Sequence, residues 1–129
     1  MKLIPFRGPK KRIRKVNKFI AAWRELQGLC RDPETWPDAL KAADKLLDKA
    51  LKKRRFKGKT MGERLVAAQR IITDNDDIWD AHNFVKKQVS NPGVKLKEAD
   101  VKQTLISFRE ALRDVGALPR GDQETKHGK

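Results

Sequence analysis

Apolar residues recur at helical spacing along most of the chain, and this pattern constrains the fold more than any other feature. The clearest stripe advances in steps of four and three residues, which places its members on one face of a helix: Val101, Leu105, Phe108, Leu112 and Val115. Four earlier segments show the same spacing: Val16, Phe19, Ile20, Trp23, Leu26 and Cys30; Leu40, Ala43, Leu47, Ala50 and Leu51; Leu65, Ala68, Ile71 and Ile72; Ile78, His82, Val85 and Val89. No segment alternates as a strand does, so the pattern predicts an all-α fold.

Residues that start helices stand before three of these stripes. The hydroxyl of Thr35 can cap the free amides of the second helix. Thr60 and Glu63 have the spacing of a capping box for the third helix, which we expect to continue through Ile72. The acidic turn 74–77 suits the positive end of the fourth helix. It lacks the spacing of a calcium-binding loop, so a helix cap is favoured over a metal site.

The short links predict a single up-and-down bundle of about five helices over residues 16–118, with Gly116 as the last C-cap. A flexible basic arm over 1–15 and a disordered polar tail over 119–129 flank it. A chain of 129 residues is long enough for one such core. The single cysteine excludes an intrachain disulfide, and with the absence of an apolar run that could span a membrane it favours a cytoplasmic protein.

Positive charge is concentrated in two segments that contain no acid. The chain has 31 Lys and Arg against 17 Asp and Glu, a net charge of +14. Residues 1–18 hold eight of these bases, and residues 49–59 hold seven. Charge concentrated in this way selects polyanionic partners, with nucleic acid as the first candidate and an anionic membrane surface as the second.

The chain offers little from which a catalytic site could be built. His82 is either a general base or a partly buried histidine held by a hydrogen bond, and the lack of a nucleophile or metal partner favours the second. Cys30 lies at the negative end of a helix, where the pKa of its thiol is raised. We therefore expect it to be a small apolar residue and not a nucleophile. Of the tryptophans, Trp36 at a helix start is the best candidate for a surface contact, although core positions are favoured for all three. No cofactor is predicted.

Several stretches resemble a bacterial family of uncharacterised helical proteins that is similar to the HEPN superfamily of helical bundles. The resemblance covers roughly Phe19 to Leu118 and rests on residues 44–48 (DKLLD), 56–65 (FKGKTMGERL), 79–82 (WDAH) and 91–92 (NP). HEPN ribonucleases cut RNA, usually as dimers, with an arginine that stabilises phosphate charge and a nearby histidine that manages a proton. In the matching stretch, Val85 stands where the arginine would be and Ser90 where the histidine would be. The resemblance therefore implies a bundle without nuclease activity.

The leading hypothesis is a non-catalytic basic module that binds nucleic acid, with RNA favoured, through its phosphates. The predicted contacts are Lys11, Arg12, Arg14, Lys52, Lys53, Arg54, Arg55 and Lys57, with Lys86 and Lys87 as a secondary patch. One alternative is a module for homodimerisation or for an acidic protein partner, since the last stripe could also form a dimer seam. Another is a ribonuclease with an unconventional site at His82.

Overall fold

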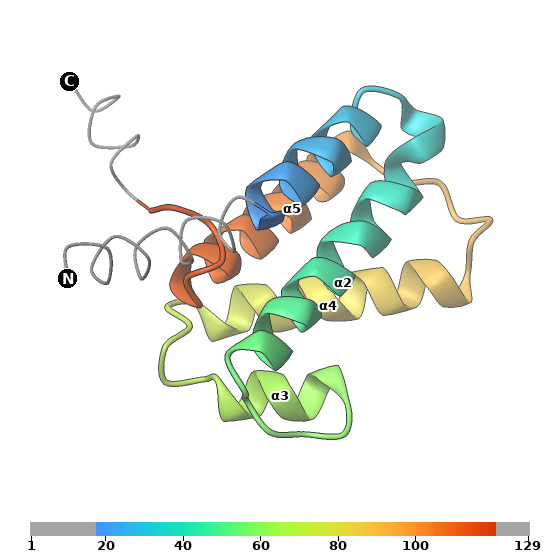
Figure 1. Ribbon diagram of the computed structural model, residues 1–129. Helices are drawn as coiled ribbons and strands as arrows, with labels where there is room; N and C mark the ends of the chain where they lie inside the picture. Colours follow the sequence, from blue (N-terminus) through green and yellow to red (C-terminus); the bar gives the residue numbers. More distant parts are fainter. Residues whose placement is uncertain (1–17, 121–129) are drawn as a thin grey trace, which may run out of the picture.

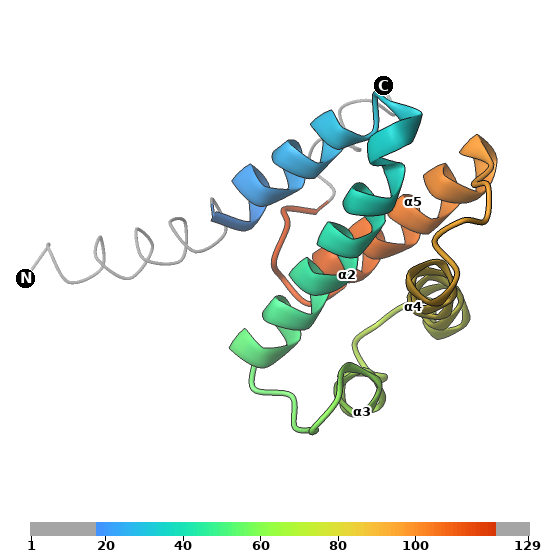
Figure 2. The ribbon, with the colours of Figure 1, turned by 90° about the vertical axis from the view of Figure 1, so that its right-hand side faces the viewer.

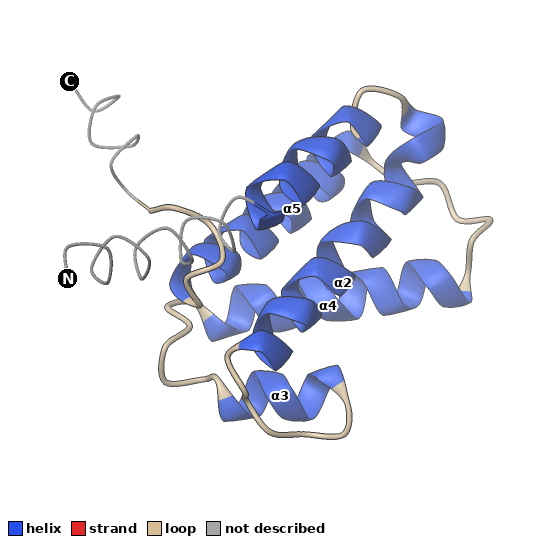
Figure 3. Cartoon of the chain, viewed as in Figure 1, coloured by secondary structure: helices blue, strands red, loops and turns tan. Residues whose placement is uncertain are grey.

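The computed structural model describes residues 18–120, and residues 1–17 and 121–129 are not described. The predicted basic arm over 1–15 therefore lies outside the described residues, as does all but the start of the predicted tail over 119–129. Within residues 18–120 all regular secondary structure is helical, which confirms the predicted all-α class (Figure 3).

The helices follow the order predicted from the apolar stripes. A helix over residues 18–29 comes first. The elements that follow it are the short 3-10 helix η1 (Pro33–Thr35) and the α-helices α2 (Trp36–Lys53), α3 (Met61–Ala67), α4 (Asn75–Ser90) and α5 (Glu98–Asp114). Each predicted helix thus has a counterpart within the described residues.

Helix α2 is the centre of the bundle and contacts η1, α3, α4 and α5. The helix over 18–29 lies beside α2 and runs antiparallel to it, because the two are joined by a tight connection (Figure 1). Turned by 90°, α3 and α4 are seen nearly end-on while α2 and α5 lie across the view (Figure 2). Helices α3 and α4 therefore cross α2 and α5 at a steep angle.

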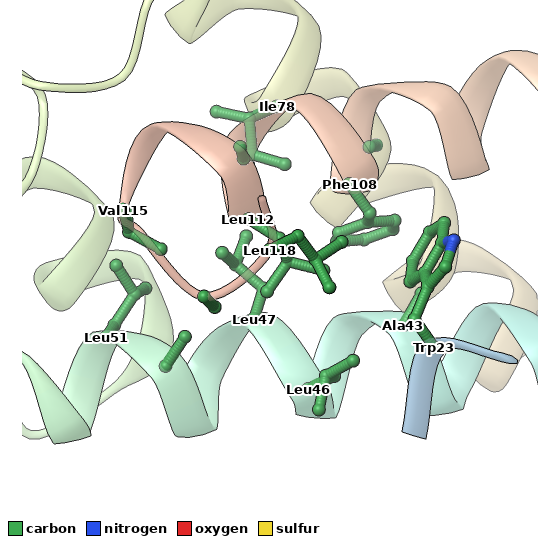
Figure 4. Packing of buried hydrophobic residues seen from close by; sticks show 14 of the residues in the cluster. Trp23, Ala43, Leu46, Leu47, Leu51, Ile78, Phe108, Leu112, Val115 and Leu118 are labelled. Atoms are coloured by element: carbon green, nitrogen blue, oxygen red, sulfur yellow. The ribbon is translucent and has the colours of Figure 1, made fainter. Parts of the chain in front are cut away.

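The core is formed where the apolar faces of α2 and α5 meet. Leu47 and Leu51 of α2 and Phe108 and Leu112 of α5 have no exposed surface. Trp23 points toward Phe108 from the first helix (Figure 4). Of the α5 stripe, Val101, Phe108, Leu112 and Val115 are buried in this core, and Leu105 is half-buried at its edge.

Val89 is the one described stripe position that the structure leaves exposed. Its exposed fraction is 53%, whereas the neighbouring Gln88 is buried. The buried face of α4 runs through Ala81, Val85 and Gln88, so Val89 lies beside that face and not on it.

The predicted helix starts at Thr60 and in the acidic turn are confirmed. The Glu63 amide donates to Thr60 Oγ1 at 3.1 Å, and Glu63 Oε1 accepts from the Lys59 amide at 2.7 Å. The carboxylate thus reaches one residue further back than in a standard capping box. Asp74 Oδ1 accepts from the Asp77 amide at 3.2 Å, so the acidic turn caps α4.

The predicted C-cap of α5 is also confirmed. Gly116 has φ +83°, and the amide of Ala117 donates to the carbonyl of Leu112 at 2.8 Å. This left-handed residue closes the helix and turns residues 117–118 back onto the core, where both are buried.

Two predictions about helix ends are wrong. Thr35 caps no amide, because its hydroxyl donates to the carbonyls of Leu29 and Asp32, at 2.5 and 3.0 Å. Helix α3 ends at Ala67 and does not continue through Ile72. The Asn75 side chain donates to two carbonyls just beyond α3, those of residues 69 and 72, which holds this segment in turns. Ile72 remains buried all the same.

Candidate nucleic-acid interface

The exposed side of α2 carries a row of lysines: Lys45, Lys49, Lys52 and Lys53. Their spacing of three and four residues places them along one face of the helix. Lys52 lies 3.7 Å from Asp48, in a solvent-exposed contact of little energetic value. Within the described part of the chain the other three have no acidic partner within ion-pair distance. Their charge is therefore not neutralised by neighbouring acids.

The cations continue beyond α2 through Arg55, Lys57 and Lys59, all exposed. Arg55 has φ 67°, a left-handed conformation that closes α2, and the amide of Phe56 donates to the carbonyl of Leu51 at 3.0 Å. Glycine adopts this conformation without the steric cost that an arginine side chain incurs. No hydrogen bond or ion pair of the Arg55 side chain to another described residue compensates for that cost.

We predict that Arg55→Gly raises the free energy of unfolding by about 0.5–1 kcal/mol, because it relieves the left-handed strain. Chemical denaturation measures the change. Lys53→Gly is the matched control: it removes the same charge, but from a helical position, where glycine is unfavourable by about 1 kcal/mol. Equal destabilisation by both substitutions would contradict the strain argument.

Arg54, a predicted nucleic-acid contact, is used within the fold. Its Nη1 donates to the carbonyl of Val115, and its guanidinium lies 5.8 Å from the centre of the Phe56 ring. These contacts join the C-terminal ends of α2 and α5. We therefore leave Arg54 out of the interface and keep Arg55.

A groove runs between the helix over 18–29 and α2. It consists of two adjoining cavities of about 780 and 480 Å³, which share Ala22, Leu46, Lys49 and Lys52. Its apolar floor is formed mainly by small and aliphatic side chains: Ala22, Leu26, Leu29, Ala42 and Leu46. Lysines border it: Lys18, Lys45, Lys49, Lys52 and Lys53. Of these only Lys52 and Lys53 were predicted contacts.

Within residues 18–120, two acidic residues line the larger cavity of this groove. They are Glu25 and Asp48. Asp48 is already paired, because Arg64 of α3 donates to its two oxygens from Nε at 2.7 Å and from Nη2 at 3.0 Å. Among the described residues, no acidic side chain lines the smaller cavity, which reaches Lys18 and Lys53. The groove is therefore most basic toward the C-terminal end of α2.

Arg64 is a buried cation that positions the loop after α2. Its Nη1 donates to the carbonyl of Gly58 at 2.7 Å, in addition to the paired bonds to Asp48. The hydrogen bonds that the guanidinium donates to Asp48 raise its pKa. Arg64 is thus a structural residue that orients the basic loop and leaves its lysines exposed.

His82 forms a second polar link of the same kind. Its Nδ1 lies 2.8 Å from Asp44 Oδ1, and its ring meets Trp79 edge to face at 6.1 Å between centroids. The residue is only 8% exposed. The prediction of a buried histidine held by a hydrogen bond is confirmed.

Two further predicted contacts, both described, lie away from the groove. Lys86 and Lys87 are exposed in the last turns of α4 and line neither cavity. Lys11, Arg12 and Arg14 lie outside the described residues. Of the two basic segments predicted as the interface, the structure thus describes residues 49–59 in full, but of residues 1–18 it describes only Lys18.

Trp36 and Cys30 have structural roles at the connection between the first helix and α2. The indole Nε1 of Trp36 donates to the carbonyl of Cys30 at 2.8 Å. The Cys30 thiol in turn donates to the carbonyl of Leu26 at 3.4 Å. Burial raises the pKa of this thiol, so the predicted direction holds but its cause is desolvation.

No cluster of acidic, histidine or cysteine side chains within residues 18–120 could hold a metal ion. In the same range, none of the helices has both the length and the apolar character needed to cross a bilayer. Comparison with protein-family models, with curated proteins and with solved structures finds no match to this chain. The HEPN resemblance therefore stays a prediction.

Proposed function

We propose that this protein is a non-catalytic helical module that binds RNA through its phosphates, using the groove lysines and the cations that follow α2. The observation that carries the proposal is the continuous set of exposed cations without acidic partners among the described residues: Lys49, Lys53, Arg55, Lys57 and Lys59. Phosphate contacts of this kind supply affinity with little sequence preference.

The backbone at Arg55 adds support to this proposal. A residue that keeps a sterically unfavourable conformation, at a site where glycine would fit better, often serves function and not stability. At this site the exposed arginine lies two residues from Lys53 and two residues from Lys57 in the chain, and both lysines are exposed as well. We infer that its charge is kept for the partner.

The absence of catalysis is part of the proposal. Val85, which stands where the HEPN arginine would be, is 3% exposed and packs in the core. Ser90, at the position of the histidine, is exposed at the end of α4. His82 is paired with Asp44 and is largely covered, so phosphate reaches it poorly. Cleavage of RNA that His82→Ala abolishes would contradict a purely binding role.

We predict that Lys49→Ala/Lys53→Ala weakens binding of a short mixed-sequence RNA and lowers its salt dependence. Each lost phosphate contact should reduce the slope of log affinity against log salt by about 0.7, hence by about 1.4 for both lysines. Fluorescence anisotropy titrations of the full chain from 50 mM salt upward measure both quantities.

The matched control for this experiment is Lys95→Ala/Lys97→Ala, which removes equal charge from the loop between α4 and α5. These lysines are exposed and line neither cavity of the groove. We expect the control to bind nearly as tightly as the parent chain. Equal losses in the two variants would mean that net charge, and not this surface, determines binding.

A module for homodimerisation is the alternative, and its main motivation was the regular stripe of α5. Four of the five residues of that stripe are buried within the chain, Leu105 is half-buried, and the exposed Ile106 of α5 does not belong to the stripe. A tight dimer in sedimentation, together with no RNA affinity at 50 mM salt, would favour this alternative over RNA binding.

A further inference from the structure

The groove between the helix over 18–29 and α2 combines an apolar surface with a cationic one. A phosphate group would need only the cationic surface. One is the apolar floor, in which Ala22 and Leu46 belong to both cavities. The other is the lysine border. Figures 1 and 2 both show the two helices as neighbours, and residues of both helices line each of the two cavities.

We propose that this groove binds single-stranded RNA in preference to a duplex, with phosphates on the lysines and at least one base against the apolar floor. This inference rests on the proposed RNA-binding function and names its substrate class. In a duplex the bases are stacked inside the helix, and only phosphates, sugars and base edges reach the protein. Contact of the apolar floor with phosphates and sugars would add no binding free energy. A single strand can turn its bases onto apolar and aromatic surface while its backbone follows the cations.

The acid-free end of the groove is the best place for such a base. Phe19 and Ala22 of the first helix line it together with Leu46 of α2. Lys18 and Lys53 border the same cavity from opposite helices. A phosphate on either side of one base would then meet a cation from each helix.

The charge of the border favours a nucleic acid over an acidic helix of another protein. Of the residues that the structure describes, four lysines and no acidic residue line the smaller cavity: Lys18, Lys49, Lys52 and Lys53. A nucleic acid supplies an anion at every nucleotide, which matches this density. An amphipathic helix presents carboxylates only at intervals of about one turn on each side of its apolar face.

The test compares a single-stranded 12-nucleotide RNA with the duplex of the same sequence, by anisotropy with the full chain. We expect the single strand to bind about tenfold more tightly. Ala22→Gln, which places a neutral polar side chain on the floor, should weaken single-strand binding about five- to tenfold and leave duplex binding unchanged. Ala21→Gln is the matched control, because the adjacent Ala21 is exposed and lines neither cavity.

Each outcome of this test has a defined meaning. Equal affinity for strand and duplex, or no effect of both Ala22→Gln and the equivalent Ala42→Gln from the α2 side, would overturn the inference and leave the proposed function standing. If the parent chain binds neither the single strand nor the duplex, the proposed function itself is overturned. Polyglutamate that competes as well as the single strand would show that charge alone is recognised, which also contradicts a base on the floor.

Discussion

Replacing Phe108 with alanine is expected to lower the free energy of unfolding by about 3–5 kcal/mol. The side chain has no exposed surface and lies between the first helix, α2 and α5 (Figure 4). Its removal loses the transfer free energy of the ring and leaves a cavity that the surrounding helices fill only in part. Because small domains are stable by about 5–15 kcal/mol in total, this is a large fraction of the whole.

Equilibrium denaturation in urea, followed by helical circular dichroism, measures this loss. Ile106→Ala on the same helix is the control, since Ile106 is 42% exposed and should cost less than about 1 kcal/mol. Similar losses at the two positions would mean that α5 does not face the core as described.

Replacing Asp48 with alanine is expected to cost about 3 kcal/mol, because it leaves Arg64 without its charged partner. The Arg64 side chain is 10% exposed and the Asp48 side chain 21%, so water cannot fully replace the pair. Breaking one side of a buried ion pair is far more costly than removing both sides. Helix α3 and the basic loop should loosen together, because Arg64 also holds the carbonyl of Gly58.

A double-mutant cycle isolates this interaction. We expect Asp48→Ala/Arg64→Met to be less destabilised than the sum of the single variants by at least about 1 kcal/mol. Lys52→Ala, which removes the exposed partner of Asp48, should change stability by less than about 0.5 kcal/mol. Strict additivity of the two substitutions would contradict the role given to this pair.

The helical class and most helix starts could be predicted because they depend on residues close together in the chain. The capping pair Thr60 and Glu63 and the cap at Asp74 need only the first turn of a helix. Val89 could not be placed in this way. The spacing placed it on one stripe with His82 and Val85, but the packing of α4 buries Gln88 and leaves Val89 exposed.

The sequence could identify the positive charge of the candidate interface, but not which of its cations are free to contact a partner. Arg54 and Arg55 are adjacent and chemically equal, yet one binds the end of α5 and the other is exposed in a left-handed conformation. The difference arises from the turn that closes α2. It directs one guanidinium toward a carbonyl 61 residues further along the chain and the other away from it.

The sequence by itself determined that the chain is helical, where most of its helices start, which faces are apolar and that α2 ends in a dense run of cations, because each of these depends on local spacing and charge. Only the tertiary structure decided that Lys18 lines the same cavity as Lys49 and Lys53, with an apolar floor between them. It also decided that Arg64 pairs with Asp48, so that this carboxylate does not repel an anion. Those outcomes depend on how helices distant in the chain pack, which no local pattern specifies.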